Sequence, residues 1–142
     1  MKAMLVSMLA FVLSVVSCSD DGVAIGFERL PEASQSFLNK YFLGLTPLVI
    51  RADGNEYEVV FTNGASVEFD RKGNWKDVNC TYRSVPADIV PSEILVTINE
   101  LYPGALIVKI ERDRRGYDVR LNVGVELEFN KKFMLTEADF ND

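Results

Sequence analysis

Residues 55–69 read NEYEVVFTNGASVEF, and this stretch decides the fold because residues 115–129, RGYDVRLNVGVELEF, repeat its pattern. In both stretches, apolar residues alternate with polar ones on either side of a central glycine, Gly64 or Gly124. Alternation around a short turn is typical of a β-hairpin with one buried face. The sequence therefore predicts two similar hairpins.

The loop length follows from keeping all apolar side chains of a hairpin on one face. A two-residue loop at Asn63–Gly64 would place Val59 opposite Glu68 and mix the two faces. A three-residue loop removes this conflict, and glycine suits its left-handed third position. In the first hairpin this loop gives the pairs Phe61–Ala65, Val59–Val67 and Tyr57–Phe69, and in the second Leu121–Val125, Val119–Leu127 and Tyr117–Phe129.

The similarity extends beyond the hairpins without a gap. Residues 30–72 and 90–132 share 11 identities in 43 positions, which indicates an internal duplication. Each half begins with a predicted helix, Leu30–Phe42 and Pro91 to about Tyr102, with proline in the first turn and glycine after the end. Four predicted strands follow each helix. We expect an α+β fold, a tandem repeat of a helix plus a four-stranded antiparallel meander (27–82 and 83–142), with the helices packed on one face of the sheet.

Composition limits the function. The chain has 142 residues, 48% of them hydrophobic, and a net charge of −6, so it is long enough for one core and a poor nucleic-acid binder. It contains no histidine, the commonest general base and a frequent transition-metal ligand. Neither a cofactor nor a metal ion is expected.

The N-terminus has the pattern of a processed export signal. Met1–Ser17 holds one lysine and then an apolar run, as a signal peptide does. Val15–Cys18 resembles a bacterial lipobox, so we expect a lipid on Cys18 and a tether over 18–26. Ser19–Asp21 resembles an acidic export tag. The expected location is the bacterial envelope, lipid-anchored to the outer membrane on its periplasmic side or at the cell surface. Ordinary secretion, with Cys18 as a thiol or disulfide partner, is the alternative.

Several motifs together carry a family resemblance. They are Tyr102-Pro103-Gly104-Ala105, Gly116-Tyr117-Asp118-Val119 and residues 124–129 (GVELEF), with matching segments at Tyr57-Glu58-Val59 and Gly73-Asn74-Trp75-Lys76. With them the chain resembles the PepSY-like family of beta-lactamase-inhibitor-like bacterial envelope proteins. The resemblance implies tandem helix-plus-sheet units whose helix-free face is available to a partner. It implies no established activity.

The strand parity predicts which side chains face away from the helices. We take these as candidate partner-binding residues: Glu56, Glu58, Glu68, Asp118, Arg120, Glu126 and Glu128. Trp75, beside a turn, is added as the best candidate for an exposed aromatic contact. The simpler interpretation is an ordinary solvated sheet face. Cys80, a lone strand thiol, is expected to be a small buried hydrophobe.

Catalysis is the least favoured class. Glu126 and Glu128 stand about 7 Å apart by strand rise, a separation that glycosidase carboxylates can have. An open sheet face, however, is expected neither to raise a carboxyl pKa nor to exclude water. We therefore expect a non-enzyme: an envelope lipoprotein that binds a protein partner through the acidic face, for example an inhibitor of a secreted or periplasmic hydrolase. The alternative is an accessory or sensory lipoprotein that binds a small molecule or a glycan.

Overall fold

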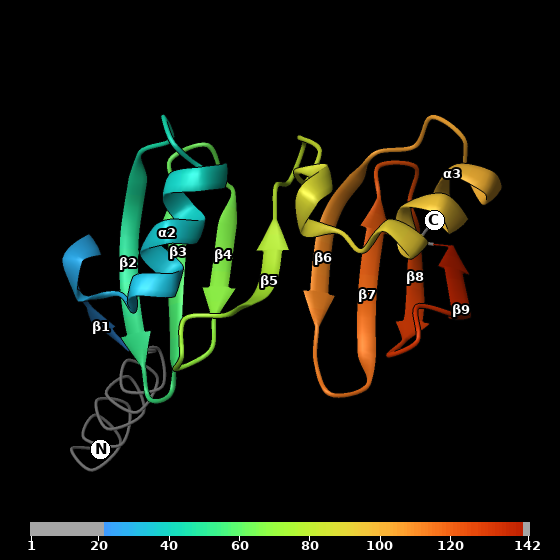
Figure 1. Ribbon diagram of the computed structural model, residues 1–142. Coiled ribbons are helices and arrows are strands. Elements are labelled where there is room, and N and C mark those ends of the chain that lie inside the picture. Colours follow the sequence, from blue (N-terminus) through green and yellow to red (C-terminus); the bar gives the residue numbers. More distant parts are fainter. Residues whose placement is uncertain (1–21, 141–142) are drawn as a thin grey trace, which may run out of the picture.

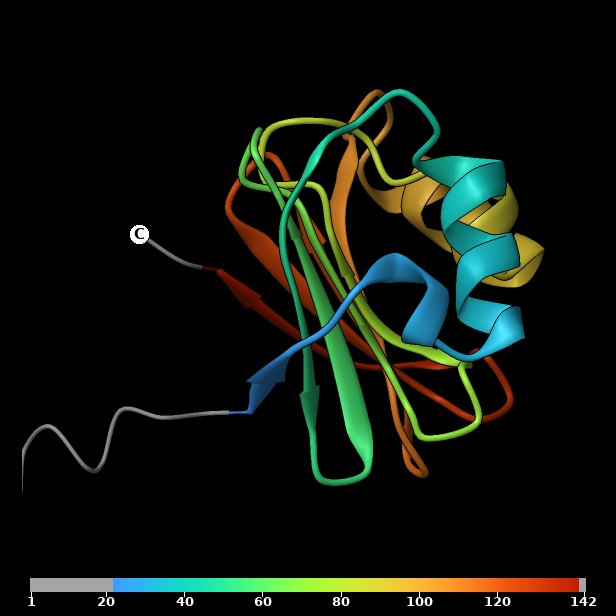
Figure 2. The same cartoon turned by 90° about the vertical axis from the view of Figure 1, so that its left-hand side faces the viewer.

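The computed structural model describes residues 22–140, and the expected signal peptide and Cys18 lie outside this range. Nine antiparallel strands form one sheet in the order of the chain, and two helices lie on one face of it (Figures 1 and 2). The strands are β1 (Val23–Ala24), β2 (Pro47–Asp53), β3 (Glu56–Phe61), β4 (Ser66–Phe69), β5 (Trp75–Asn79), β6 (Ile107–Arg112), β7 (Gly116–Leu121), β8 (Val125–Asn130) and β9 (Leu135–Phe140). No helix within residues 22–140 combines the length and apolarity needed to span a membrane.

The two helices begin and end where the sequence signals lie. The helices are α2 (Glu32–Tyr41) and α3 (Ser92–Leu101), each preceded by a proline at its N-cap. Gly44 and Gly104 follow the helix ends with φ of 93° and 82°, a left-handed conformation that glycine adopts without steric cost. Short 3₁₀ turns, η1 (Phe27–Arg29) and η2 (Ala87–Ile89), lead into the helices.

Both predicted hairpin registers are confirmed. Val59 pairs with Val67 and Tyr57 with Phe69 in the first hairpin, and the second shows the corresponding pairs. The Phe61 N–H donates to the Ala65 carbonyl at 2.8 Å, which closes a three-residue loop with Gly64 at φ 90°.

The core fills the space between the sheet and the helices. Buried side chains from every strand from β2 to β8 form one cluster with Leu38 of α2 and Ile94 and Ile98 of α3. The Phe37 ring lies edge-on to Phe69 with centroids 5.6 Å apart. Cys80 is 8% exposed, which confirms the expected buried thiol.

The predicted fold class is wrong, because the chain does not form two successive helix-plus-meander units. Strands β5 and β6 pair with each other, through Asp77–Glu111, Val78–Ile110 and Asn79–Lys109, so all strands belong to one continuous sheet. The pairing satisfies backbone groups that a separate four-stranded meander would leave open along β5. A further difference is β1, Val23–Ala24, which lies in the segment expected to be a tether and pairs with β2.

Candidate functional site

The helix-free face of the sheet carries a row of carboxylates. One line of directly opposite residues crosses the sheet from β3 to β9 without interruption. Each of these strands contributes an acidic residue to the line. We call this set the carboxylate row: Glu58, Glu68, Asp77, Glu111, Asp118, Glu128 and Glu137. Directly opposite residues lie only about 5 Å apart, so seven carboxyl groups follow one another closely across the sheet.

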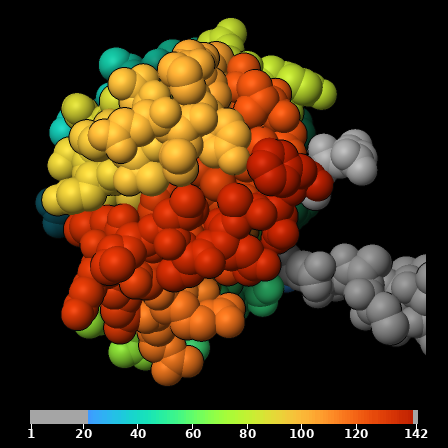
Figure 3. Space-filling model, turned by 90° about the vertical axis from the view of Figure 1, so that its right-hand side faces the viewer, coloured from blue at the N-terminus to red at the C-terminus, as the bar shows by residue number. Residues whose placement is uncertain are grey.

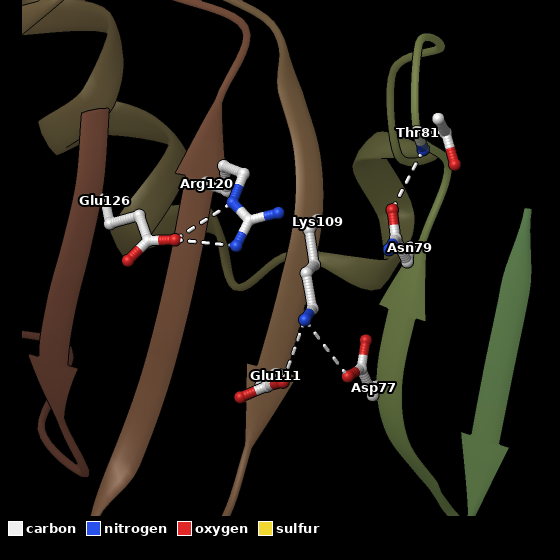
Figure 4. A network of polar contacts seen from close by, with 7 residues as sticks. All are labelled: Asp77, Asn79, Thr81, Lys109, Glu111, Arg120 and Glu126. Carbon is white, nitrogen blue, oxygen red and sulfur yellow. Dashed lines mark hydrogen bonds and ion pairs between the residues drawn. The ribbon is translucent and has the colours of Figure 1, made fainter. Parts of the chain in front are cut away.

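Arginine and lysine neutralise only part of the carboxylate row. Arg51 on β2 closes one end, with its Nη1 3.3 Å from Glu58 Oε1. Lys109 lies between two further members, with its Nζ 3.5 Å from Asp77 Oδ2 and 3.1 Å from Glu111 Oε1 (Figure 4). Within the described part of the chain, the other four members have no lysine or arginine nitrogen within 4.0 Å. They are Glu68, Asp118, Glu128 and Glu137.

Partial burial and the neighbouring carboxylates raise the pKa values of several members of the row. Partial burial, and then the neighbouring Glu58, raises the pKa of Glu68. Burial and the facing Glu128 raise the pKa of Asp118. A hydrogen bond with Glu137, followed by its charge, raises the pKa of Glu128. The expectation that an open face leaves carboxyl pKa values unshifted is therefore wrong, although the face remains open to water.

Asp77 is the most strongly shifted member. Its side chain is 17% exposed, and burial raises its pKa to about 7, with a hydrogen bond to Glu111 as the second cause. Its Oδ1 is buried without a hydrogen-bond partner. A protonated Asp77 turns one oxygen into a donor, which suits a facing carboxylate acceptor on Glu111. The interaction with Asp77 correspondingly lowers the pKa of Glu111.

The predicted residues are distributed around this row. Glu58, Glu68, Asp118 and Glu128 belong to it. Glu126 lies two residues before Glu128 on β8, outside the row. Its Oε1 accepts hydrogen bonds from Arg120 Nη2 at 2.7 Å and Nε at 2.9 Å (Figure 4). Glu56 pairs with Lys76. Asp77, Glu111 and Glu137 escaped the sequence reasoning, although their alternation with buried neighbours such as Val78 and Ile110 was a usable signal.

Trp75 does not belong to this face. It is 9% exposed and pairs with Phe69, whose side chain is in the core. The Arg112 guanidinium lies 3.8 Å from the centre of its ring and donates from Nε to the Trp75 carbonyl at 2.7 Å. The prediction of an exposed aromatic contact at Trp75 is wrong, because the sheet continues past β5 and Arg112 of β6 covers the ring.

The helix-free face is shallow. One hollow of about 210 Å³ lies over β6–β8 with Lys109, Asp118 and Glu128 among its lining, and another of about 270 Å³ lies over β2–β4 beside Arg51 and Glu68. Across residues 22–140, no three acidic or cysteine side chains converge in a way that could hold a metal ion. The carboxylates form a line along a surface, which suits contact with a large partner better than enclosure of a small one.

Comparison with known proteins identifies the family of this chain. Residues 55–137 match the family model described as "Putative beta-lactamase-inhibitor-like, PepSY-like". The chain belongs to the PepSY-like family. The predicted family resemblance is therefore confirmed, and the match includes the strands that carry the carboxylate row.

Solved structures of similar proteins share the fold. A protein of Bacteroides vulgatus, described as "a putative periplasmic protein" from the DUF2874 family, has 36% sequence identity and a TM-score of 0.82, with 85% of this chain and 98% of that chain covered. A "putative calcium-regulated periplasmic protein" of Bacteroides thetaiotaomicron has 39% identity and a TM-score of 0.77, covering 82% and 94%. A second Bacteroides vulgatus protein, "a putative periplasmic protein of unknown function", has 28% identity and a TM-score of 0.78, covering 82% and 98%.

A search of curated proteins finds no match. The periplasmic descriptions of the relatives support a place for this PepSY-like chain in the cell envelope.

Proposed function

We propose that this PepSY-like protein is a non-catalytic envelope protein that binds a basic protein partner through the helix-free face of its sheet. The carboxylate row carries the proposal. Like charges directly opposite each other destabilise a sheet, and here acidic residues face each other across seven adjacent strands. Local violations of folding rules are expected where a surface serves binding.

The electrostatics favour a cationic partner. Burial and neighbouring carboxylates raise the pKa values of Glu68 and Asp118, and interaction with Glu137 raises the pKa of Glu128. Lysine or arginine side chains from a partner would relieve this repulsion, so the gain on binding exceeds that of an isolated surface charge. A rigid sheet also presents the row without an entropic cost for ordering loops.

The family description supports a binding role over catalysis. Inhibition of a secreted or periplasmic hydrolase is one form that such binding could take, since the family is named inhibitor-like. Asp118, Glu128 and Glu137 of the row are exposed to water, whereas acid–base catalysis favours a site that excludes water.

Charge reversal tests the proposal. In a pull-down from envelope extract, replacing Glu58, Glu68 and Glu128 together with lysine should abolish capture of the basic partner. The matched control replaces three exposed helix glutamates with lysine and changes the net charge by the same amount on the opposite side: Glu32, Glu93 and Glu100. Equal capture by both triple variants would refute a docking role for this face.

Membrane attachment is a separate part of the proposal. The lipobox-like Val15–Cys18 supports a lipid on Cys18, which would hold the protein at the outer membrane. Labelled palmitate should be incorporated into the natural chain and not into Cys18→Ala. Incorporation that survives the substitution would place the lipid elsewhere or reject the anchor.

One observation favours the alternative of small-molecule binding. A hollow of about 410 Å³ lies between α3 and the start of β6, lined mainly by apolar residues that include Val85, Leu95 and Ile107. It suits an apolar ligand better than a glycan, since its lining contains no charged side chain. If the protein works by docking, Leu95→Trp, which fills this hollow, should leave capture of the basic partner unchanged.

A further inference from the structure

Strand β9 is an open edge of the sheet. It pairs with β8 only, and no other strand within residues 22–140 lies against its outer side. Figure 3 looks onto this side, where the red surface of β9 crosses the molecule below α3. Every second residue of such a strand directs its N–H and C=O outward, which makes it a template for another strand. The opposite edge, β1, is only two residues long, whereas β9 has six, of which the last five are exposed.

The carboxylate row ends differently at the two sides of the sheet. Toward β2 it ends on a cation, because Arg51 lies directly opposite Glu58 and forms an ion pair with it. Toward β9 it ends on Glu137, which faces Glu128 on its inner side. A tenth strand would therefore gain most from a basic residue opposite Glu137, as β3 gains from Arg51.

The neighbouring positions of β9 specify the partner further. Asp139 points to the same face as Glu137, so a second basic residue fits opposite it. Phe140 lies on the other face, where it pairs with the buried Val125 and is itself 69% exposed. It lines a hollow of about 580 Å³ together with Leu101 and Val123, which are 53% and 58% exposed. An apolar side chain opposite Phe140 would fill this hollow.

We propose that β9 accepts an extended segment of the basic partner as a tenth strand, with lysine or arginine opposite Glu137 and Asp139 and an apolar side chain opposite Phe140. The proposal rests on the proposed function, because the same carboxylate row selects the partner. Backbone hydrogen bonds to β9 provide affinity, and the alternating side chains provide specificity.

A second copy of this chain is a poorer occupant. Antiparallel self-pairing centred on Ala138 would place Glu137 opposite Asp139 of the other copy, and pairing centred on Glu137 would place two glutamates together. Like charges in directly opposite positions are destabilising, and the chain already carries a net charge of −6. The acidic residues of β9 therefore oppose self-association while they favour a basic strand.

A synthetic peptide with capped termini that alternates lysine and valine tests the proposal, because it fits β9 in either direction. Titration of the purified protein should shift the β9 amide resonances and slow hydrogen exchange at every second β9 amide. A peptide of the same composition in blocks of two lysines and two valines is the control for charge alone. It should bind at least about tenfold more weakly, which corresponds to about 1.4 kcal/mol.

Charge exchange makes the test specific. Glu137→Lys with Asp139→Lys should weaken binding of the lysine–valine peptide about tenfold or more, and a glutamate–valine peptide should then bind this variant. Three outcomes would each overturn the tenth-strand proposal. The alternating and block peptides could bind equally well, or the peptide could perturb only β3 and β4. The protein could also dimerise through β9, with the dimer detected by sedimentation. The β9 test can give such a result while the lysine variant of Glu58, Glu68 and Glu128 still loses its partner. In that case only the tenth-strand site is rejected, and docking on the helix-free face is retained.

Discussion

Asp77 should make the stability of the protein depend on pH in an unusual direction. Its carboxyl lies on β5 at the seam with β6, 17% exposed, and burial followed by interaction with Glu111 raises its pKa from 3.8 to about 7. Between these values the folded state binds a proton that the unfolded state has released. The free energy of unfolding therefore falls as the pH rises from about 4 to 7.

The size of the effect follows from the shift. About 3 pKa units correspond to about 4 kcal/mol, since one unit is about 1.4 kcal/mol. Roughly 3 kcal/mol of this should be lost between about pH 5 and 8. Asp77→Asn keeps the shape and cannot ionise, so it should remove this slope. The stability of the variant relative to the natural protein should therefore be about 3 kcal/mol more favourable near pH 8 than near pH 5.

Urea unfolding followed by Trp75 fluorescence measures this directly, because Trp75 is the single tryptophan and is buried beneath Arg112. Asp139→Asn removes the same charge from the exposed edge strand and serves as the control, with an expected effect within about 0.5 kcal/mol. Parallel pH profiles for the natural protein and Asp77→Asn would refute the reasoning. A variant that is less stable at pH 8 would do so too, and would show that the ion pair with Lys109 outweighs burial.

Three further predictions concern stability, each measured by urea unfolding. Glu68→Lys should stabilise the fold by about 0.5–1 kcal/mol, because it replaces one of three consecutive carboxylates across the strands; a loss would show that these charges do not repel in the fold. Gly73→Ala should cost more than about 2 kcal/mol, since φ is 90° and the new Cβ would lie 2.7 Å from Pro31 Cβ. Gly54→Ala, at φ 56° with no atom within 4 Å, is its control and should cost about 1 kcal/mol. Leu127→Ala, at a fully buried position, should cost about 2–5 kcal/mol; a smaller loss would indicate a loosely packed core.

Local features of the fold could be predicted from the sequence because their causes are local. The alternation of Val59 and Phe61 with polar residues sets the buried face, and Gly64 supplies the left-handed turn residue, so the hairpin register followed without any tertiary information. The helices began after proline and ended before glycine, as predicted to within two residues. The outward orientation of Glu58 and Glu68 followed from the same parity.

The environment of Trp75 could not be predicted in this way. Parity placed it with Phe69, but its exposure depended on whether another strand lay beside β5. Arg112 covers it from β6, more than thirty residues later in the chain. Side-chain burial at a strand edge is a property of the neighbouring strand, which local patterns do not specify.

By itself, the sequence determined the two hairpins, the helix ends, the apolar face and the acidic character of the opposite face, because each depends on residues only a few positions apart. Only the tertiary structure decided that β5 pairs with β6. That pairing merges what looked like two units into one sheet and brings Asp77 opposite Glu111. The continuous carboxylate row and the raised pKa of Asp77 both follow from this contact, whose paired residues are 30 to 34 positions apart and share no local signal.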